Sequence, residues 1–597
     1  MGFRSRRSLL AYAAVLLGGW LLALSARAQP VVQAGGSGGV ETYEWERTRK
    51  VLERQGLVVA ENAAVENKPI AWIRIVRNDI FVPDELVPLW LNKFHSRTRE
   101  FVVRRELLFH EGGPYHDARI EETMRNLRNM GIFALVRIVP IQVEDPNKVG
   151  VLVYTRDIWS LRLEQAFNIT TQINQLSLQL TEVNLFGANK QVGLDFEMFP
   201  KTYFFLPSFY ARRVLNSRVG LNAGAGPILN RAHNQVEGSL WRLRVGEPFY
   251  YLNQHFSYQL NGAYTDQVVR RVRDGDVQKY QPDGKGTPFA NAVFRQKTPS
   301  VNLWGYYRRG DAYKQTFGVG WDYREIHASP THESDVPAAL RDGFERTVLP
   351  MQRREIGPAL EYAIFVPKFA TFNNLSTFGK SENVQVGPTA DVLVRAPLAA
   401  FGSNVSSWVL SGDFGYVVAP GGGLLQLKVG GRTRYQQGEL YDQLATAVLR
   451  GATPILGWVR LVGRAYVEAR RRDTARTYVT LGSDMALRGF PSQYLWGYGA
   501  SRWLANFEAR TLPWKFHAFY LGGVAFFDVG SVFYKWSEAH PYYAAGLGIR
   551  FLFSKLSRYP FSVDGGTSPQ YGYNPVPAFN SHQTVPMTEY EDTLIGF

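Results

Sequence analysis

The chain has 597 residues, more than one ordinary soluble domain, so at least two folded units are expected. It contains no cysteine, which excludes disulfide bonds, thiol catalysis and cysteine-ligated metal sites. The formal net charge is +15 at pH 7, but the basic residues are spread along the chain rather than gathered in a helix or tail, which argues against a nucleic-acid-binding protein.

The N-terminus has the pattern of an export signal, residues 1–28. Three arginines precede an apolar run at 9–24, and small residues at 26–28 provide a cleavage site. The run is too short and wrongly flanked for a stable transmembrane anchor. We expect residues 29–67 to form a glycine-rich linker and then a polar helix at 43–56 that precedes the first folded domain.

A small α/β domain is predicted at residues 68–157. Asp117 can cap a helix that carries Ile120, Met124 and Leu127 on one face and ends at Gly131. The expected elements, in chain order, are a strand at 70–76, helices at 99–109 and 117–131, and strands at 133–143 and 149–157. This is about the smallest unit that folds alone.

From residue 158 onward, apolar and polar residues alternate with period two. In the segment 458–470, Leu461 and Val467 point one way while Arg460 and Glu468 point the other. Segments of about ten residues with one apolar and one charged face are typical of a transmembrane β-barrel. A soluble β-sandwich is the alternative, but its core would not place several arginines inward.

The alternating segments number about 20, which predicts an antiparallel barrel over 158–597. Fifteen precede residue 472, and the last strand is expected in "TEYEDTLIGF" at 588–597, after a polar stretch. An even number of strands returns the chain to the side of the small domain. The long connections at 266–298, 326–355 and 472–499 all follow odd-numbered strands, so we expect them on the opposite, external side.

Several motifs occur in a characteristic order. They are "RRELLFHEGGPY" and "RNLRNMGIFALVRI" in the small domain, then "TEVNLFGANKQ", "LGSD" followed by "LRGF", "ANFEARTLP" and "AFFDVGSVF". In this order the sequence resembles the Omp85 superfamily, which comprises outer-membrane barrel assembly proteins and two-partner secretion transporters. The resemblance implies that 68–157 is a POTRA domain in the periplasm of a Gram-negative-type bacterium and that 158–597 is a barrel in its outer membrane.

The sequence departs from the family pattern in two respects. Assembly proteins carry five POTRA domains and secretion transporters two, whereas one is visible here. The family barrel has 16 strands, so the resemblance and the pattern together give a range of 16 to 20 strands.

The resemblance also implies a site on the sixth external loop. Its signature motif is formed by Leu487, Arg488, Gly489 and Phe490. In the family this loop folds into the lumen, where the arginine pairs with carboxylates on the wall; by alternation, Glu508 and Asp528 face the lumen and are the candidate partners. These two residues are not directly opposite each other, so whether Arg488 binds one or both stays open.

The resemblance implies insertion or translocation of proteins. The expected partners are unfolded outer-membrane or secreted client proteins captured by the POTRA-like domain, outer-membrane lipid, and periplasmic chaperones or accessory lipoproteins, with no nucleic acid. A passive diffusion channel remains as the alternative function. An outer-membrane enzyme is disfavoured because cysteine is absent and the ten histidines are scattered, so no catalytic residue, metal or bound cofactor is expected.

Overall fold

The computed structural model describes residues 43–587 apart from short gaps at 82–91, 94, 169–175, 216, 274–275, 283–287, 380, 517–518, 554 and 558. The predicted export signal at 1–28, the start of the linker and the expected last strand at 588–597 therefore lie outside the described residues. Across the described ranges, no helix is long and apolar enough to cross a membrane.

The small domain is a three-stranded sheet with two helices on one face. Its elements are β1 (Ile70–Asn78), α4 (Glu100–Arg104), α5 (Asp117–Asn129), β2 (Phe133–Ile141) and β3 (Val149–Asp157). The strand order is β1-β3-β2, in which β3 pairs parallel with β1 and antiparallel with β2. The predicted apolar face of α5 packs with Val151 and Val153 of the central strand in one core cluster.

A further helix covers the other face of this sheet. In α2 (Tyr43–Gln55), Val51 and Leu52 pack against Leu152 and Tyr154 of β3. All nine residues of β3 are buried as a result. The sequence placed this helix in a segment that precedes the domain, but its apolar positions belong to the domain's second core; the short α3 (Asn62–Val65) follows it.

The rest of the chain forms a closed antiparallel barrel. Within the described residues the barrel sheet contains 23 strands, of which β15, β19 and β26 each continue a neighbour across a two-residue break. Counting each interrupted pair as one strand, the barrel wall has 20 strands in the described residues, which we call staves. In chain order they are β4 (Leu161–Asn168), β5 (Leu176–Glu182), β6 (Lys190–Met198), β7 (Thr202–Ala211), β8 (Gly220–Asn230), β9 (Val236–Glu247), β10 (Phe256–Arg270), β15 (Val293–Lys297) with β16 (Ser300–Arg309), β17 (Lys314–Pro330), β18 (Arg353–Phe365) with β19 (Lys368–Asn373), β20 (Ser381–Arg395), β21 (Trp408–Val418), β22 (Leu424–Gln436), β23 (Glu439–Ala452), β24 (Val459–Arg471), β25 (Ser501–Thr511) with β26 (Trp514–Phe516), β27 (Phe519–Phe533), β28 (Tyr542–Phe553), β29 (Phe561–Thr567) and β30 (Val576–Asn580).

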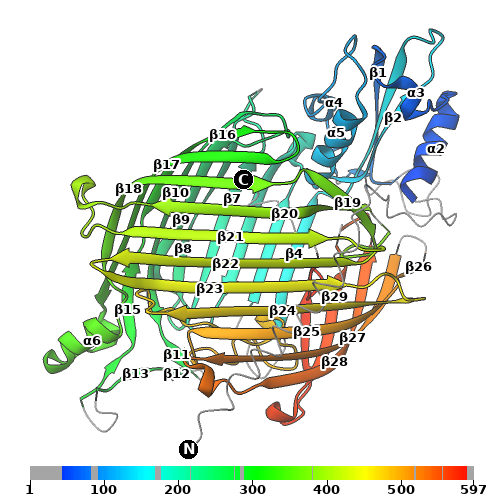
Figure 1. Cartoon of the computed structure of the whole chain (residues 1–597). Helices are drawn as coiled ribbons and strands as arrows, with labels where there is room; N and C mark the ends of the chain where they lie inside the picture. The colour runs from blue at the N-terminus through cyan, green and yellow to red at the C-terminus, as the bar shows by residue number, and fades with distance from the viewer. Residues whose placement is uncertain are drawn as a thin grey trace, which may run out of the picture. The chain divides into compact units, whose positions relative to one another are not determined.

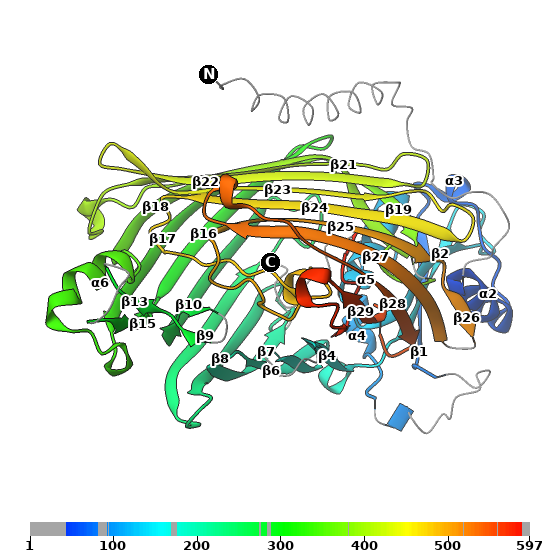
Figure 2. The ribbon, with the colours of Figure 1, turned by 90° about the horizontal axis from the view of Figure 1, so that it is seen from below.

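The staves keep the predicted alternation. Strands β20 to β25 lie side by side in one wall (Figure 1), and β21 to β24 face β6 to β8 across the barrel (Figure 2). On β28, Leu547, Ile549 and Phe551 are exposed on the outer surface, whereas Arg550 is buried inside. An apolar outer face around a charged interior is what a barrel in lipid requires. The predicted fold class, an antiparallel transmembrane barrel of 16 to 20 strands with one small α/β domain, is confirmed.

The two ends of the barrel differ. We call the end at which β4 begins the near end, because only three residues separate β4 from the last strand of the small domain, and the opposite end the far end. The predicted long loops at 266–298 and 326–355 lie at the far end. They are partly structured: β10, β15 and β17 extend into them, and α6 (Arg341–Thr347) packs Phe344 into a small apolar cluster there. The short strands β11 (Val272–Arg273), β12 (Asp276–Val277), β13 (Lys279–Tyr280) and β14 (Ala290–Asn291) complete this region.

The closing strand is not where the sequence placed it. The barrel closes between β30 (Val576–Asn580) and β4, inside the polar stretch that was expected to precede a terminal strand at 588–597. With five residues that include Pro577, β30 is too short to show a periodic signal and contains a residue that lacks a backbone donor.

Candidate functional site

The signature motif lies inside the barrel. It belongs to the far-end connection between β24 and β25, residues 472–500, whose single turn of 3-10 helix is Ser483–Met485. Leu487 and Phe490 are fully buried, and Arg488 is 1% exposed. The side chain of Arg488 contacts inward-facing residues of three different staves, so the loop folds back into the lumen.

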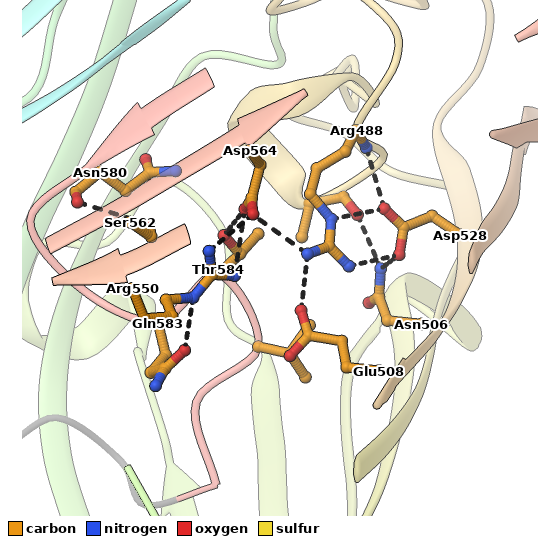
Figure 3. Close-up of polar contacts among 12 residues, drawn as sticks. Arg488, Asn506, Glu508, Asp528, Arg550, Ser562, Asp564, Asn580, Gln583 and Thr584 are labelled. Atoms are coloured by element: carbon orange, nitrogen blue, oxygen red, sulfur yellow. Dashed lines mark hydrogen bonds and ion pairs between the residues drawn. The ribbon is translucent and has the colours of Figure 1, made fainter. Parts of the chain in front are cut away.

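Arg488 binds both of its predicted partners (Figure 3). Its Nε and Nη2 donate to the two carboxylate oxygens of Asp528 at 2.7 and 2.8 Å, which is a bidentate pair. Its Nη1 donates to Oε1 of Glu508 at 2.6 Å, and its backbone N–H donates to Asp528 at 3.1 Å. The question left open by the strand register is therefore answered: the guanidinium spans two staves and reaches both carboxylates.

Two neighbours hold this ion pair in place. Asn506 donates from Nδ2 both to Asp528 and to the backbone carbonyl of Ala486 in the loop, each at 2.7 Å. The Arg488 guanidinium carbon lies 3.6 Å from the ring centroid of Phe526, a cation–π contact. Asn506 thus holds the carboxylate of Asp528 in place, and the ring of Phe526 packs against the face of the Arg488 guanidinium.

Three further charged residues, none of which was predicted as a site residue from the sequence, extend the pair into a network. Asp564 lies 3.5 Å from Nη1 of Arg488 and accepts from Nη1 of Arg550 at 2.7 Å. Arg510 donates from Nε to Glu508 at 2.7 Å. A signal was present for two of them, since Arg550 and Asp564 are the lone charged residues on β28 and β29, at inward positions.

The network is balanced in charge and buried. It contains three arginines and three carboxylates, and each of them is at most 6% exposed: Arg488, Arg510, Arg550, Glu508, Asp528 and Asp564. Burial lowers the pKa of the Arg488 guanidinium, but the charges of Asp528 and Glu508 outweigh burial and raise that pKa above its ordinary value. Arg488 therefore stays charged, and removing one partner would leave an uncompensated charge in a buried site.

Two glycines allow the loop backbone to touch the wall. Gly489 has φ +85°, and a Cβ there would lie 2.7 Å from the Cβ of Ala544. On the wall, a Cβ at Gly566 of β29 would lie 2.6 Å from the backbone nitrogen of Gly489. Both positions require glycine, one for its backbone conformation and both for the close approach.

An aromatic cluster completes the docking of the loop. The ring of Phe490 lies 5.0 Å from that of Tyr494 in the same loop and 5.8 Å from that of Tyr542 on β28, the second in an edge-on arrangement. Leu487 and Leu504 belong to the same buried cluster. The motif is thus anchored by charge on one side of the backbone and by aromatic packing on the other.

The seam between the first and last staves is short in the part of the chain that the structure describes. The register of β30 with β4 covers three residue pairs, from Ala578 with Asn168 to Asn580 with Ala166. On the other side of β4 the register with β5 covers seven pairs. Among all neighbouring staves, β30 and β4 share the fewest residue pairs in the described residues.

Nothing in the described part of the chain resembles a metal centre. No group of three or more His, Asp or Glu residues there is placed to hold a metal ion. The luminal site itself is an ion-pair network, which binds and positions a segment of protein.

Comparison with known families identifies the small domain. A model of the POTRA family, described as surface antigen variable number repeat, matches residues 94–155. No curated protein sequence matches the chain. The described residues thus contain a POTRA domain followed by a closed antiparallel barrel, which is the order of domains that the sequence motifs predicted.

Solved barrel structures show a remote similarity. The chain is similar to CdiB from Escherichia coli, with a TM-score of 0.42, 11% identity, and 88% of this chain and 78% of that chain covered. It is also similar to BamA from Haemophilus ducreyi lacking POTRA domains 1–3 (TM-score 0.35, 12% identity, 86% and 84% covered). A third is the FrpB iron transporter from Neisseria meningitidis (TM-score 0.35, 9% identity, 93% and 98% covered). These scores are low, and no residue role or activity follows from them.

Proposed function

We propose that the protein inserts or translocates client proteins at the outer membrane, with its POTRA domain in the periplasm and a barrel that opens at the β30–β4 seam. The observation that carries this proposal is the seam itself: the closing strand β30 has only five residues, and among the described residues it forms three residue pairs with β4. Unpaired backbone in lipid is costly, so a strand edge with so little pairing favours an incoming strand that supplies the missing hydrogen bonds.

The POTRA domain offers a place to hold a client before it reaches the seam. Strand β2 lies at the edge of the three-stranded sheet and pairs along its length only with β3. On this edge the backbone carbonyl of Val136 accepts from Arg128 and the N–H of Ile138 donates to the sulfur of Met124, both on α5. Val59 bridges Ile141 near the end of the strand. An incoming strand would have to displace the two α5 side chains. Addition of an extended client segment to such an edge uses backbone hydrogen bonds and requires little sequence specificity.

The occupied lumen disfavours the alternative of a passive diffusion channel. A channel needs an open path, whereas the signature loop here crosses the interior and is fixed to β25, β27 and β29 by the Arg488 network. A lumen that is closed at rest and a seam that is weakly paired fit a protein that handles clients one at a time.

The proposal is tested by locking the seam. Because the chain has no cysteine, Ala166→Cys combined with Asn580→Cys gives a single disulfide across the partner residues of β4 and β30. The purified variant is placed in lipid vesicles and given a urea-unfolded small outer-membrane barrel protein as client. We expect insertion, read as protease protection of the client, when the disulfide is reduced and its loss when the disulfide is formed.

A matched control pair lies on a long seam. Ala445 and Ala469 are partners between β23 and β24, which share ten residue pairs, so Ala445→Cys with Ala469→Cys places a disulfide in a wall that is not expected to open. This control should insert clients equally well when oxidised and when reduced. Undiminished insertion by the protein locked at the β30–β4 seam would refute opening at that seam.

A further inference from the structure

The chain does not end at its closing strand. After β30, residues 581–587 turn into the near half of the lumen, and the buried side chains alternate: Gln583 is 3% exposed, and Val585 and Met587 are fully buried. We call this segment, residues 581–587, the strap. Its burial pattern is that of a bound peptide rather than of a surface tail.

Charged wall residues bind the polar part of the strap (Figure 3). Nε of Arg550 donates to the side-chain carbonyl of Gln583 at 2.8 Å, and the hydroxyl of Thr584 donates to Oδ2 of Asp564 at 2.6 Å. Nη2 of Arg510 donates to the backbone carbonyl of Val585. Residues of three staves thus bind one backbone acceptor and two side chains of the strap, of which Gln583 is buried and Thr584 half-buried.

The apolar part of the strap fills a cluster at the near end of the lumen. Val585 and Met587 pack with Leu375 and with Leu424 and Val462 of the wall. Leu375 belongs to the turn after β19, whose backbone N–H groups at 375–377 all donate to the buried carboxylate of Glu382. The turn is therefore a rigid platform, and the strap lies between it and the barrel wall.

The strap is joined to the weak seam. The backbone N–H of Ser581 donates to the carbonyl of Gln165 on β4 at 3.1 Å, and its hydroxyl accepts from the N–H of Gln165 at 2.7 Å. The hydroxyl of Ser562 on β29 donates to the carbonyl of His582 at 2.7 Å. The first two residues of the strap therefore prolong the pairing that holds β30 between β29 and β4.

The strap also shares a residue with the signature loop. Asp564 accepts hydrogen bonds from Thr584 of the strap, from Arg550 of the wall and, at 3.5 Å, from Arg488 of the loop. The loop enters from the far end and the strap from the near end, so Asp564 is the point at which the two luminal segments meet.

We infer that the near half of the lumen is a peptide-binding site, which the chain fills with its own residues 581–587 and from which a client segment displaces them. The ligand class is a peptide with an amide and a hydroxyl side chain followed by two apolar side chains at alternating positions. Displacement withdraws Ser581 and His582 from the seam, so binding of a client inside the lumen loosens the β30–β4 closure. The link to clients rests on the proposed function, whereas the binding site itself does not.

The test is binding of the strap peptide to a protein whose own strap has been expelled. The probe is the fluorescent heptapeptide Ser-His-Gln-Thr-Val-Pro-Met, the sequence of residues 581–587. In the full-length variant Val585→Asp/Met587→Asp, two charges oppose re-entry of the strap into its apolar cluster. In the parent, the strap occupies the site in most molecules, and the apparent affinity for added peptide falls in proportion to the fraction of molecules whose site is empty. We therefore expect fluorescence anisotropy to show that the variant binds the peptide at least about tenfold more tightly than the parent.

Two controls accompany this measurement. The variant Val585→Ile/Met587→Leu keeps an apolar strap and should bind the peptide as weakly as the parent. A scrambled heptapeptide should bind neither protein. Equal affinity of the parent and the Asp variant for the strap peptide, or equal binding of the scrambled peptide to the Asp variant, would overturn the inference.

A second measurement does not depend on the Asp variant folding. In the otherwise cysteine-free chain, Met587→Cys replaces a fully buried residue and Tyr573→Cys one that is 69% exposed. A water-soluble maleimide should label Tyr573→Cys rapidly and Met587→Cys slowly, and excess strap peptide should accelerate only the second. Equally rapid labelling at both positions without peptide would show that the strap does not occupy the site. Neither measurement uses client insertion, so the proposed function can fail while the binding site stands.

Discussion

Arg488 holds the signature loop in its position inside the barrel. Its guanidinium makes hydrogen bonds or ion pairs with carboxylates of β25, β27 and β29, all of them buried. A buried pair adds little when it replaces well-packed apolar residues, but its loss from one side is expensive because the remaining charge has neither water nor partner. The arginine therefore fixes the position of the loop more than it adds to the total stability.

We predict that Arg488→Ala lowers the free energy of unfolding by about 3–5 kcal/mol, because Asp528 and Glu508 lose their buried counter-charge. Urea unfolding of the detergent-solubilised protein, followed by tryptophan fluorescence, measures this change. Arg472→Ala is the control: Arg472 lies in the same loop, and its side chain is 49% exposed and pairs with an equally exposed Glu439. The control should change stability by less than about 1 kcal/mol, and equal effects of the two substitutions would mean that Arg488 is an ordinary loop arginine.

Adjacent glycines on β29 allow the close approach of the loop to be tested separately. A Cβ at Gly566 would lie 2.6 Å from the backbone nitrogen of Gly489, whereas a Cβ at Gly565 would meet nothing nearer than 3.9 Å. We expect Gly566→Ala to push the loop from the wall and to expose it to added protease, while Gly565→Ala leaves the cleavage pattern unchanged. Resistance of both variants to cleavage within 472–500 would argue against the tight contact.

At the scale of elements, helix α2 has a larger role than its polar sequence indicates. Leu52 is 5% exposed and belongs to the core on the second face of the POTRA sheet. We predict that Leu52→Ala destabilises this domain by about 2–5 kcal/mol, the usual cost of a large-to-small change in a core. Limited proteolysis of the full-length protein should then cut within 43–157 at a lower urea concentration.

Glu53 provides the neighbouring control for that experiment. Its side chain is 67% exposed and forms only a surface pair with Arg49, so Glu53→Ala should leave the cleavage midpoint nearly unchanged. If the two substitutions gave the same midpoint, α2 would contribute nothing to the core of the domain.

The elements that could be predicted from the sequence are those with a long, regular pattern. Alternation over ten or more residues located β24 and β25, and the same alternation pointed Glu508 toward the lumen. It could not locate β30, because five residues that include a proline show no period. The strap was missed for a related reason: a polar stretch resembles an exposed loop unless the wall residues that bind it are known, and those come from strands distant in sequence.

The candidate site could also be predicted only in part, because some of its residues come together through contacts between distant strands. The motif Leu487–Phe490 could be read from the family order of motifs, and its carboxylate partners from strand alternation. The third carboxylate, Asp564, joins the network because β29 lies next to β28 and near the loop, an arrangement set by closure of the whole barrel. A lone charge on an otherwise uncharged strand is the local signal that would have suggested it.

At the scale of the whole molecule, the barrel is closed at rest by two inserted segments and one short seam. The signature loop enters from the far end, the strap enters from the near end, and Asp564 contacts both. We expect a protein built in this way to conduct little while both luminal segments are in place, and the proposed opening at the β30–β4 seam lies directly beside the strap.

Closure of the lumen by the signature loop is tested most directly by the conductance of the purified protein in planar lipid bilayers, for the parent, Arg488→Ala and Arg472→Ala. We expect small, fluctuating conductance for the parent and for Arg472→Ala, and larger or longer openings for Arg488→Ala, because only that substitution releases the loop from the lumen wall. A large, steady conductance that is the same in all three proteins would contradict this closure and would make a passive diffusion channel the better description.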